Sequence, residues 1–153
     1  MDNYTLRPLT ISDYDVVYAL WQKTEGMGLG DSDTREAIAA FLERNCGLSI
    51  VACSSDDQIV GAVLCGHDGR RGYLHHLAVA LAHRKQGIGR ALVNEGVAKL
   101  AAHKIQKVNL FLFAQNSEGR TFWQHQGWTA REDIVLVQKA LCRPLIKAQR
   151  STA

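Results

Sequence analysis

The segment from residue 73 to residue 92 constrains the fold of this chain most. An apolar, β-prone run ends in Leu77-Ala78-Val79, a short basic loop follows, and a helix-forming run begins through Gly87 and Gly89. Glycines at the start of a helix leave its first backbone N–H groups uncovered, and these groups and the helix dipole favour a bound anion. Three cations lie around the glycines in the sequence: Arg84, Lys85 and Arg90. The segment therefore predicts a strand, a phosphate-binding loop and a helix.

Two well-known phosphate loops do not fit this segment. A Walker A loop needs Gly-Lys followed by Ser or Thr, whereas Gly89 is followed by Arg90 and Ala91. The dinucleotide fingerprint needs three glycines directly after the strand, but the third position is Leu92, and seven residues separate Val79 from Gly87. The loop is therefore neither a P-loop nor a Rossmann turn.

The remaining pattern, Arg-x-x-Gly-x-Gly over residues 84–89, resembles the pyrophosphate loop of the general N-acetyltransferase (GNAT) superfamily. A second block, from Asn116 to Trp128, resembles the Asn-x-x-Ala-x-x-aromatic-Tyr pattern of that family and its following Gly-Phe. The resemblance extends over nearly the whole chain. It implies an acyltransferase with N-acetyltransferase activity that uses acetyl-CoA as its donor and binds the CoA at this loop.

The hydrophobic pattern predicts one domain over residues 1–142 and a basic, frayed tail over residues 143–153. Expected strands cover 4–8, 48–54, 58–66, 73–79, 108–113 and 134–137, the last one buried, and expected helices cover 12–23, 33–46, 87–103 and 116–126. Ser12 and Asp33 are expected to cap the first two helices. With the resemblance, the fold class is α/β (α+β), a GNAT fold: a central mixed, mostly antiparallel sheet of six to seven strands flanked by about four helices.

Composition excludes several classes of protein. No apolar run approaches the ~18 residues of a membrane span and no signal peptide is evident, so we expect a cytoplasmic protein without membrane contact. The four cysteines have no metal-ligand spacing, so no metal is expected. A net charge of +3 is too small to indicate nucleic-acid binding; RNA binding through the basic tail is kept as an alternative, and a homodimer is left open.

The resemblance also implies which residues bind CoA. The backbone of Leu77 and Val79 would pair with the pantetheine arm, and the Leu77 N–H would stabilise the oxyanion of the transition state. The expected cofactor-binding set is Leu77, Ala78, Val79, Arg84, Lys85, Gln86, Gly87, Ile88, Gly89, Arg90, Ala91, Asn116 and Trp123. For Asn116, helix capping is the local alternative.

Two adjacent histidines are the candidate proton carriers. A primary amine with a pKa near ~10 is mostly protonated at neutral pH and must lose a proton before it attacks a thioester. Strand alternation predicts Tyr73, His75 and Leu77 on one face and His76 on the other. In arylalkylamine acetyltransferases a His-x-His pair occupies this strand, and the resemblance places His75 on its second histidine and Tyr73 on its first. His75 is therefore the expected base, and packing without catalysis is the alternative for both histidines.

Trp123 departs from the family pattern. The family commonly has a tyrosine there that protonates the leaving thiolate, and an indole N–H does not give up its proton in this role. The expected acceptor site comprises Trp21, Glu25, Met27, His75 and Trp123. The acceptor is a primary amine of a small molecule, an amino acid or a protein N-terminus; a catalytically weak acyl-CoA-binding or regulatory module is the alternative function, for which Trp123 is the main argument.

Overall fold

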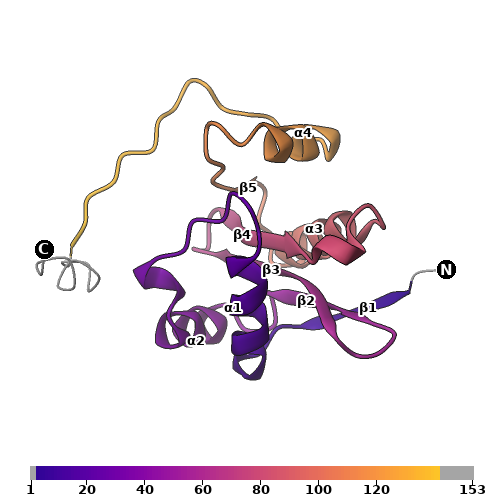
Figure 1. Ribbon diagram of the computed structural model, residues 1–153. Coiled ribbons are helices and arrows are strands. Elements are labelled where there is room, and N and C mark those ends of the chain that lie inside the picture. Colours follow the sequence, from indigo (N-terminus) through magenta and orange to yellow (C-terminus); the bar gives the residue numbers. More distant parts are fainter. Residues whose placement is uncertain (1–2, 142–153) are drawn as a thin grey trace, which may run out of the picture. The chain divides into compact units, whose positions relative to one another are not determined.

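A five-stranded mixed sheet forms the centre of the structure, a computed structural model that describes residues 3–141 (Figure 1). The strands lie in chain order: β1 (Tyr4–Pro8), β2 (Ile50–Ser54), β3 (Ile59–His67), β4 (Gly72–Val79) and β5 (Val108–Asn109). The first four pair antiparallel, and β5 pairs parallel with β4. The predicted mixed, mostly antiparallel sheet is confirmed, but it has five strands within the described residues rather than six to seven.

Four helices accompany the sheet, as predicted: α1 (Tyr14–Gln22), α2 (Arg35–Arg44), α3 (Ile88–Ala102) and α4 (Ser117–His125). Short 3-10 turns lie at Ile11–Asp13, Asp31–Asp33 and Leu81–His83. The chain divides after Phe113 into two compact units, of which the first contains the sheet and α1 to α3 and the second contains α4. A single domain over residues 1–142 stays a prediction.

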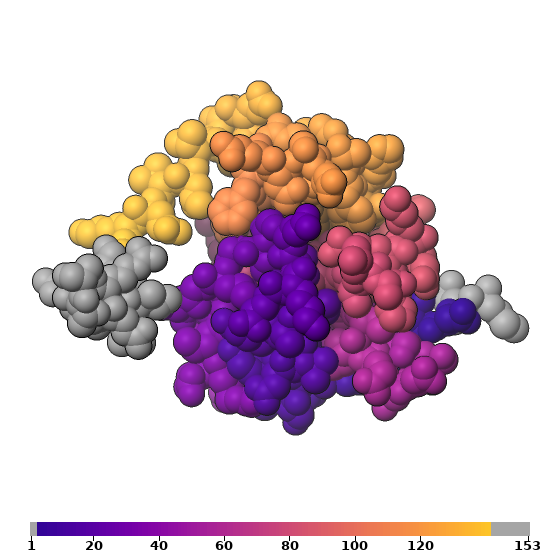
Figure 2. Space-filling model, in the orientation of Figure 1, coloured from indigo at the N-terminus to yellow at the C-terminus, as the bar shows by residue number. Residues whose placement is uncertain are grey.

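Helices cover both faces of the sheet in the first unit. On one face, Gly96 allows α3 to approach Leu74 and Cys65, and Leu92 and Leu100 of the same helix are fully buried. On the other face, α1 and α2 bury an apolar cluster against the sheet: Leu9, Val17, Trp21, Ile38, Val51, Cys53, Ala62, Leu64 and Ala78. Figure 2 shows this second face, where the indigo and purple atoms of α1, α2 and their connecting loop form a continuous surface. Burial on two faces explains the nearly unbroken apolar sequence of β2 and β3.

The caps of the first two helices differ from the sequence prediction. A 3-10 turn precedes α1, and its Asp13 carboxylate, rather than Ser12, accepts a hydrogen bond from the backbone N–H of Thr10 (2.9 Å). At α2, Thr34 is the N-cap and its hydroxyl accepts from the Ala37 N–H (3.2 Å). Asp33 lies one residue too early to cap α2, which leaves its carboxylate for other contacts.

Two predicted strands are wrong in length or in kind. Strand β5 pairs with β4 only at Val108 and Asn109, not over 108–113. Residues 134–137 form no strand in the described part of the chain, and Val135 and Val137 are 83% and 86% exposed. Their β-branched sequence has strand propensity, but a strand also needs a neighbour with which to pair.

Within residues 3–141, no helix has the length and apolar character needed to cross a bilayer. The predicted basic tail, residues 143–153, lies outside the described residues.

A bidentate ion pair joins β1 to the turn before α1. Both terminal nitrogens of Arg7 bond to the Asp13 carboxylate, at 2.8 Å and 2.9 Å. Asp13 is only 9% exposed, and its hydrogen bonds with Arg7 lower the pKa of its carboxyl below the ordinary value of 3.8. The carboxylate is therefore more stable in the folded chain than in the unfolded chain.

Asp13→Asn should lower the free energy of unfolding at neutral pH by about 1–3 kcal/mol, since it removes a charge-assisted bond at a nearly buried site. Because the folded pKa lies below the unfolded one, this contribution is complete above pH 3.8 and is lost as the pH falls through the folded pKa. Urea unfolding over a series of pH values checks this: the gap between wild type and variant should close in acid. Asp15→Asn is the matched control, since the Asp15 side chain is 84% exposed in its pair with Arg35. If the difference in free energy of unfolding between wild type and Asp13→Asn did not change with pH, the lowered pKa of Asp13 would be contradicted.

Candidate active site

The loop before α3 has the geometry of an anion site. Gly87 adopts a left-handed conformation (φ 84°) immediately before the helix, which favours glycine at that position. The first helical hydrogen bond runs from the Ala91 N–H to the Gly87 carbonyl (2.9 Å). The N–H groups of residues 88–90 therefore precede the helical ladder and are free to bind an anion.

Three exposed cations flank these N–H groups in the chain. Arg84, Lys85 and Arg90 all lie at the surface, and none of them takes part in an ion pair within residues 3–141. Arg84 also donates from Nε to the carbonyl of Val79 (3.0 Å), which fastens the loop to the end of β4. Gln86 is exposed as well, whereas the Ile88 side chain is buried, so that only its backbone faces the loop. These residues fit a phosphate-bearing ligand.

The second half of β4 has an open edge. Strand β5 pairs with Gly72 and Tyr73 only, so no described strand lies beside the segment from Leu74 to Val79 on that side. This segment ends at the loop that leads to α3. An extended ligand that adds to the edge of β4 would thus reach the anion site, and the predicted pantetheine contacts of Leu77 and Val79 need such an edge.

A β-bulge places both histidines on the same face of the sheet. The register of β4 with β3 shifts between the pairs Leu64↔His75 and Ala62↔Ala78, and His76 has a left-handed backbone (φ 52°). His75 contacts Phe41 of α2 and His76 contacts Trp21 of α1, with ring centroids 6.1 Å and 4.9 Å apart. The prediction from strict alternation, that the histidines point to opposite faces, is therefore wrong. An extra residue in one strand breaks the period of two.

His75 lies in an aromatic stack. Its ring is parallel to that of Tyr73 (5.9 Å between centroids, 3° between planes) and stacks on Phe111 (6.1 Å). Burial lowers the pKa of His75 below its ordinary value of 6.5, the nearby His76 lowers it further, and Asp33 opposes both effects. The imidazole is therefore neutral at pH 7 and has a lone pair with which to accept a proton.

His76 is held by a carboxylate. Its Nε2 lies 2.7 Å from Oδ1 of Asp33, and the two side chains are 19% and 7% exposed. The other carboxylate oxygen, Oδ2, accepts from the N–H of Gly30 (2.9 Å), and the Asp33 backbone carbonyl accepts from the Tyr14 hydroxyl (2.6 Å). Sequence reasoning missed Asp33 as a site residue because its position before a helix has a simpler explanation, that of a cap.

The other expected acceptor residues of the first unit lie in α1 and in the loop that follows it. Trp21 is 1% exposed, so its indole supports the ring of His76 rather than lining an open surface. Met27 packs against the apolar cluster, and Glu25 is exposed. A Cβ at Gly28 would lie 2.8 Å from the ring of Phe113, so this loop lies directly against that ring.

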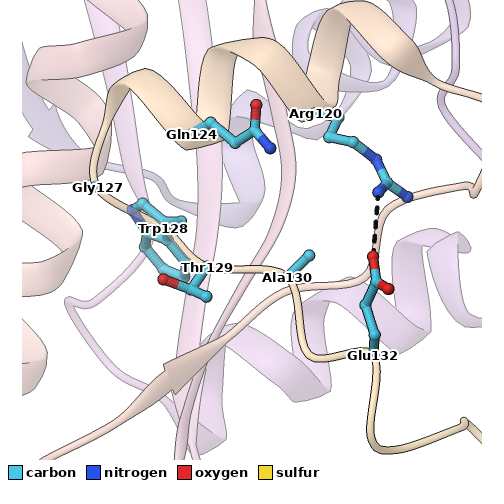
Figure 3. Close-up of a pocket in the computed structure, with 7 residues that line it drawn as sticks. All are labelled: Arg120, Gln124, Gly127, Trp128, Thr129, Ala130 and Glu132. Atoms are coloured by element: carbon cyan, nitrogen blue, oxygen red, sulfur yellow. Dashed lines mark ion pairs between the residues drawn. The ribbon is translucent and has the colours of Figure 1, made fainter.

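In the second unit, the side chain of Asn116 accepts from the Gly119 N–H (2.9 Å) and caps α4, the local role foreseen as its alternative. Trp123 packs edge-on against Phe122 and Trp128, with centroids 5.1 Å and 5.0 Å away. An open hollow of about 480 Å³ lies in this unit, and Arg120 and Glu132 in its lining are 4.0 Å apart. Figure 3 shows the residues that line it. Its lining comes from α4 and the segment that follows: Arg120, Gln124, Gly127, Trp128, Thr129, Ala130 and Glu132.

Comparisons with known proteins agree with this geometry. The family described as Acetyltransferase (GNAT) family matches residues 14–128. An acetyltransferase from Sodalis glossinidius is 26% identical over 136 residues, which are 89% of this chain and 94% of that protein. Ard1 from Thermoplasma volcanium has a similar fold, with a TM-score of 0.73, 19% identity and 83% coverage of each chain. The PaiA N-acetyltransferase from Thermoplasma acidophilum, solved in complex with coenzyme A, has a TM-score of 0.72 and 18% identity, over 84% of this chain and 91% of that one. The family match spans most of the chain, and the chain therefore belongs to the GNAT family of acetyltransferases.

Proposed function

We propose that this chain transfers the acetyl group of acetyl-CoA to a primary amine by direct attack of the amine on the thioester, with both substrates bound together. As a GNAT acetyltransferase the chain uses acetyl-CoA as its acyl donor. The observation that carries the proposal is the bulge in β4, which places two imidazoles on one face of a strand whose open edge leads to the anion site.

The donor would be held by backbone groups and by charge. The first-turn N–H groups of α3 and the cations Arg84, Lys85 and Arg90 would bind the pyrophosphate of CoA. The pantetheine arm would add to the open edge of β4 at Leu77 and Val79. In this arrangement the Leu77 N–H donates to the thioester oxygen, whose negative charge grows in the transition state.

Proton transfer would involve His75. The acceptor enters as an ammonium ion and loses one proton to the neutral imidazole of His75; its free electron pair then attacks the thioester carbonyl carbon. The C–S bond breaks, the CoA thiolate takes up a proton, and the nitrogen loses its second proton as the amide forms. The stack of His75 on Tyr73 and Phe111 holds the imidazole ring in place during these steps. No covalent intermediate with the protein is required.

The acceptor is identified by an amine screen. The purified full-length chain is incubated with acetyl-CoA and a panel of arylalkylamines, polyamines, free amino acids, aminoglycosides and peptides with free N-termini. Thiol release and amide formation by mass spectrometry are measured together, and hydrolysis without amine is the blank. Amine-dependent formation of both products supports the proposal, and thiol release without an amide contradicts it.

A catalytically weak acyl-CoA-binding module is the second candidate function, because Trp123 occupies the position of the usual tyrosine acid. Such a module would bind CoA in calorimetry and release no thiol with any amine in the panel. CoA binding followed by turnover would exclude it.

Trp123→Phe should retain most of the transfer activity, since an indole N–H is not a proton donor to a thiolate and the phenyl ring preserves an aromatic side chain. Trp123→Ala should instead lower the free energy of unfolding by about 1–3 kcal/mol, because it removes two edge-on aromatic contacts, with Phe122 and Trp128, each worth about 0.5–1.5 kcal/mol. Steady-state kinetics with an identified amine and thermal unfolding measure the two effects. A Phe variant that is folded but inactive would show that the indole N–H takes part in the reaction.

A further inference from the structure

Asp33 connects the α1–α2 loop to the bulge of β4 through two different hydrogen bonds. One carboxylate oxygen accepts from the Gly30 backbone in the loop (2.9 Å), and the other contacts Nε2 of His76 in the strand (2.7 Å). The carboxylate is 7% exposed. A buried carboxylate is stable only when its oxygens receive hydrogen bonds, and here each oxygen has a donor.

This geometry determines which nitrogen of His76 carries the proton. An ionised carboxylate only accepts hydrogen bonds, so Nε2 must be the donor of the 2.7 Å bond. In the neutral imidazole the other nitrogen, Nδ1, then has the free lone pair. A carboxylate that fixes the tautomer of a histidine in this way prepares the opposite nitrogen to accept a proton.

The backbone of His76 gives an independent reason to expect a role for this residue. Its φ of 52° is in the left-handed region, which is uncommon for residues other than glycine and persists where the surroundings impose it. The ring of His76 packs edge-on against Trp21 of α1 and bonds to the Asp33 carboxylate. Within residues 3–141 the buried indole nitrogen of Trp21 has no hydrogen-bond partner, so the Asp33 carboxylate is the anchor of the ring.

We infer that Asp33 is a positioning residue of the acetyl-transfer site: it fixes the Nε2–H tautomer of His76 and so presents Nδ1 as a second proton acceptor beside His75. Two protons leave the acceptor nitrogen during transfer, the first before its attack on the thioester and the second after it. Two imidazoles on one face can share these transfers. This inference rests on the proposed function.

Asp33→Asn should change the tautomer of His76 while it keeps the hydrogen bond to the Gly30 N–H in the loop. The Gly30 N–H needs an acceptor, so the amide oxygen of the substituted side chain should face it, which turns the amide NH₂ toward His76. That NH₂ can only donate, so Nε2 becomes an acceptor and the proton moves to Nδ1. The loop bond is kept, but His76 has the wrong tautomer.

The test combines NMR with kinetics. NMR of nitrogen-labelled histidine in the free protein should show His76 as the Nε2–H tautomer in wild type and as the Nδ1–H tautomer in Asp33→Asn, with His76→Gln identifying the signal. The kcat for acetyl transfer should fall about 100-fold, the lower range for a general base, with the KM for acetyl-CoA unchanged. Asp31→Asn, an exposed acid in the same 3-10 turn, is the matched control and should change neither.

A double-mutant cycle tests whether Asp33 acts through His76. In a His76→Gln background, Asp33→Asn should cause no further loss of kcat. Additive losses, or an unchanged His76 tautomer in Asp33→Asn, would overturn the inference. If wild type acetylates no amine, the proposed function fails and with it the positioning role, whereas a tautomer that fails to change overturns the inference even in an active enzyme. Thermal unfolding confirms that each variant is folded.

Discussion

Gly89→Glu should abolish most of the affinity for acetyl-CoA, by about 100-fold or more, equivalent to at least about 2.7 kcal/mol. The substitution places a carboxylate in the first turn of α3, beside the N–H groups of residues 88–90 that are expected to bind the pyrophosphate. A negative side chain there satisfies the helix dipole and repels the phosphates. Isothermal titration with CoA measures the loss, and it does not depend on identifying the acceptor.

Asn94→Glu is the matched control for this experiment. It introduces the same charge on the same helix, at an exposed position beyond the first turn, and should leave CoA affinity unchanged. An unaltered CoA affinity in Gly89→Glu would remove the basis of the phosphate site, and with it the proposed orientation of the donor along β4.

The donor side of this protein could be predicted from sequence because its determinants are local. The glycines, the cations and the strand that precedes them lie within residues 73–92, and a helix N-terminus binds anions by backbone geometry that such a segment largely specifies. The family, the acyltransferase class and the acetyl-CoA donor, which were inferred from that segment together with the block from Asn116 to Trp128, are confirmed. The cations around Gly87 lie at the surface.

The acceptor side depends on contacts between distant residues, and there the prediction was less complete. A bulge is one extra residue in a strand, and the sequence around His76 contains no glycine that would indicate it. Without the bulge, alternation assigns the two histidines to opposite faces. Asp33 was assigned to a helix cap because its partner is 43 residues away in the chain.

The end of β5 is a second departure from the alternation pattern. Strand β5 pairs with β4 only as far as Tyr73, before the bulge in β4. Phe111, which was expected within a strand, stacks instead on Tyr73 and His75. The short β5 thus leaves the edge of β4 open, and the bulge brings both imidazoles to one face of the sheet.

His75→Ala should lower turnover by about 100-fold near neutral pH, the usual size of general-base assistance at its lower range. The CoA affinity should stay near that of wild type, because the expected donor contacts are made by backbone groups of β4 and by the loop before α3. Steady-state kinetics with an identified amine measure the first effect, and titration with CoA measures the second. His103→Ala, an exposed imidazole at the end of α3, is the control and should change neither.

The pH dependence of this loss distinguishes a base from a packing residue. The base must be neutral, and burial lowers the pKa of His75 below 6.5, so its assistance should persist at pH values somewhat below 6.5 and disappear as the pH falls through the lowered pKa. At high pH the ratio of wild-type to variant rates should also shrink, because an amine with a pKa near ~10 then loses its proton without help. The ratio should therefore be largest between these limits. A ratio that is constant over the whole range would mean that His75→Ala only disturbs the stack with Tyr73 and Phe111, and His75 would then be a packing residue.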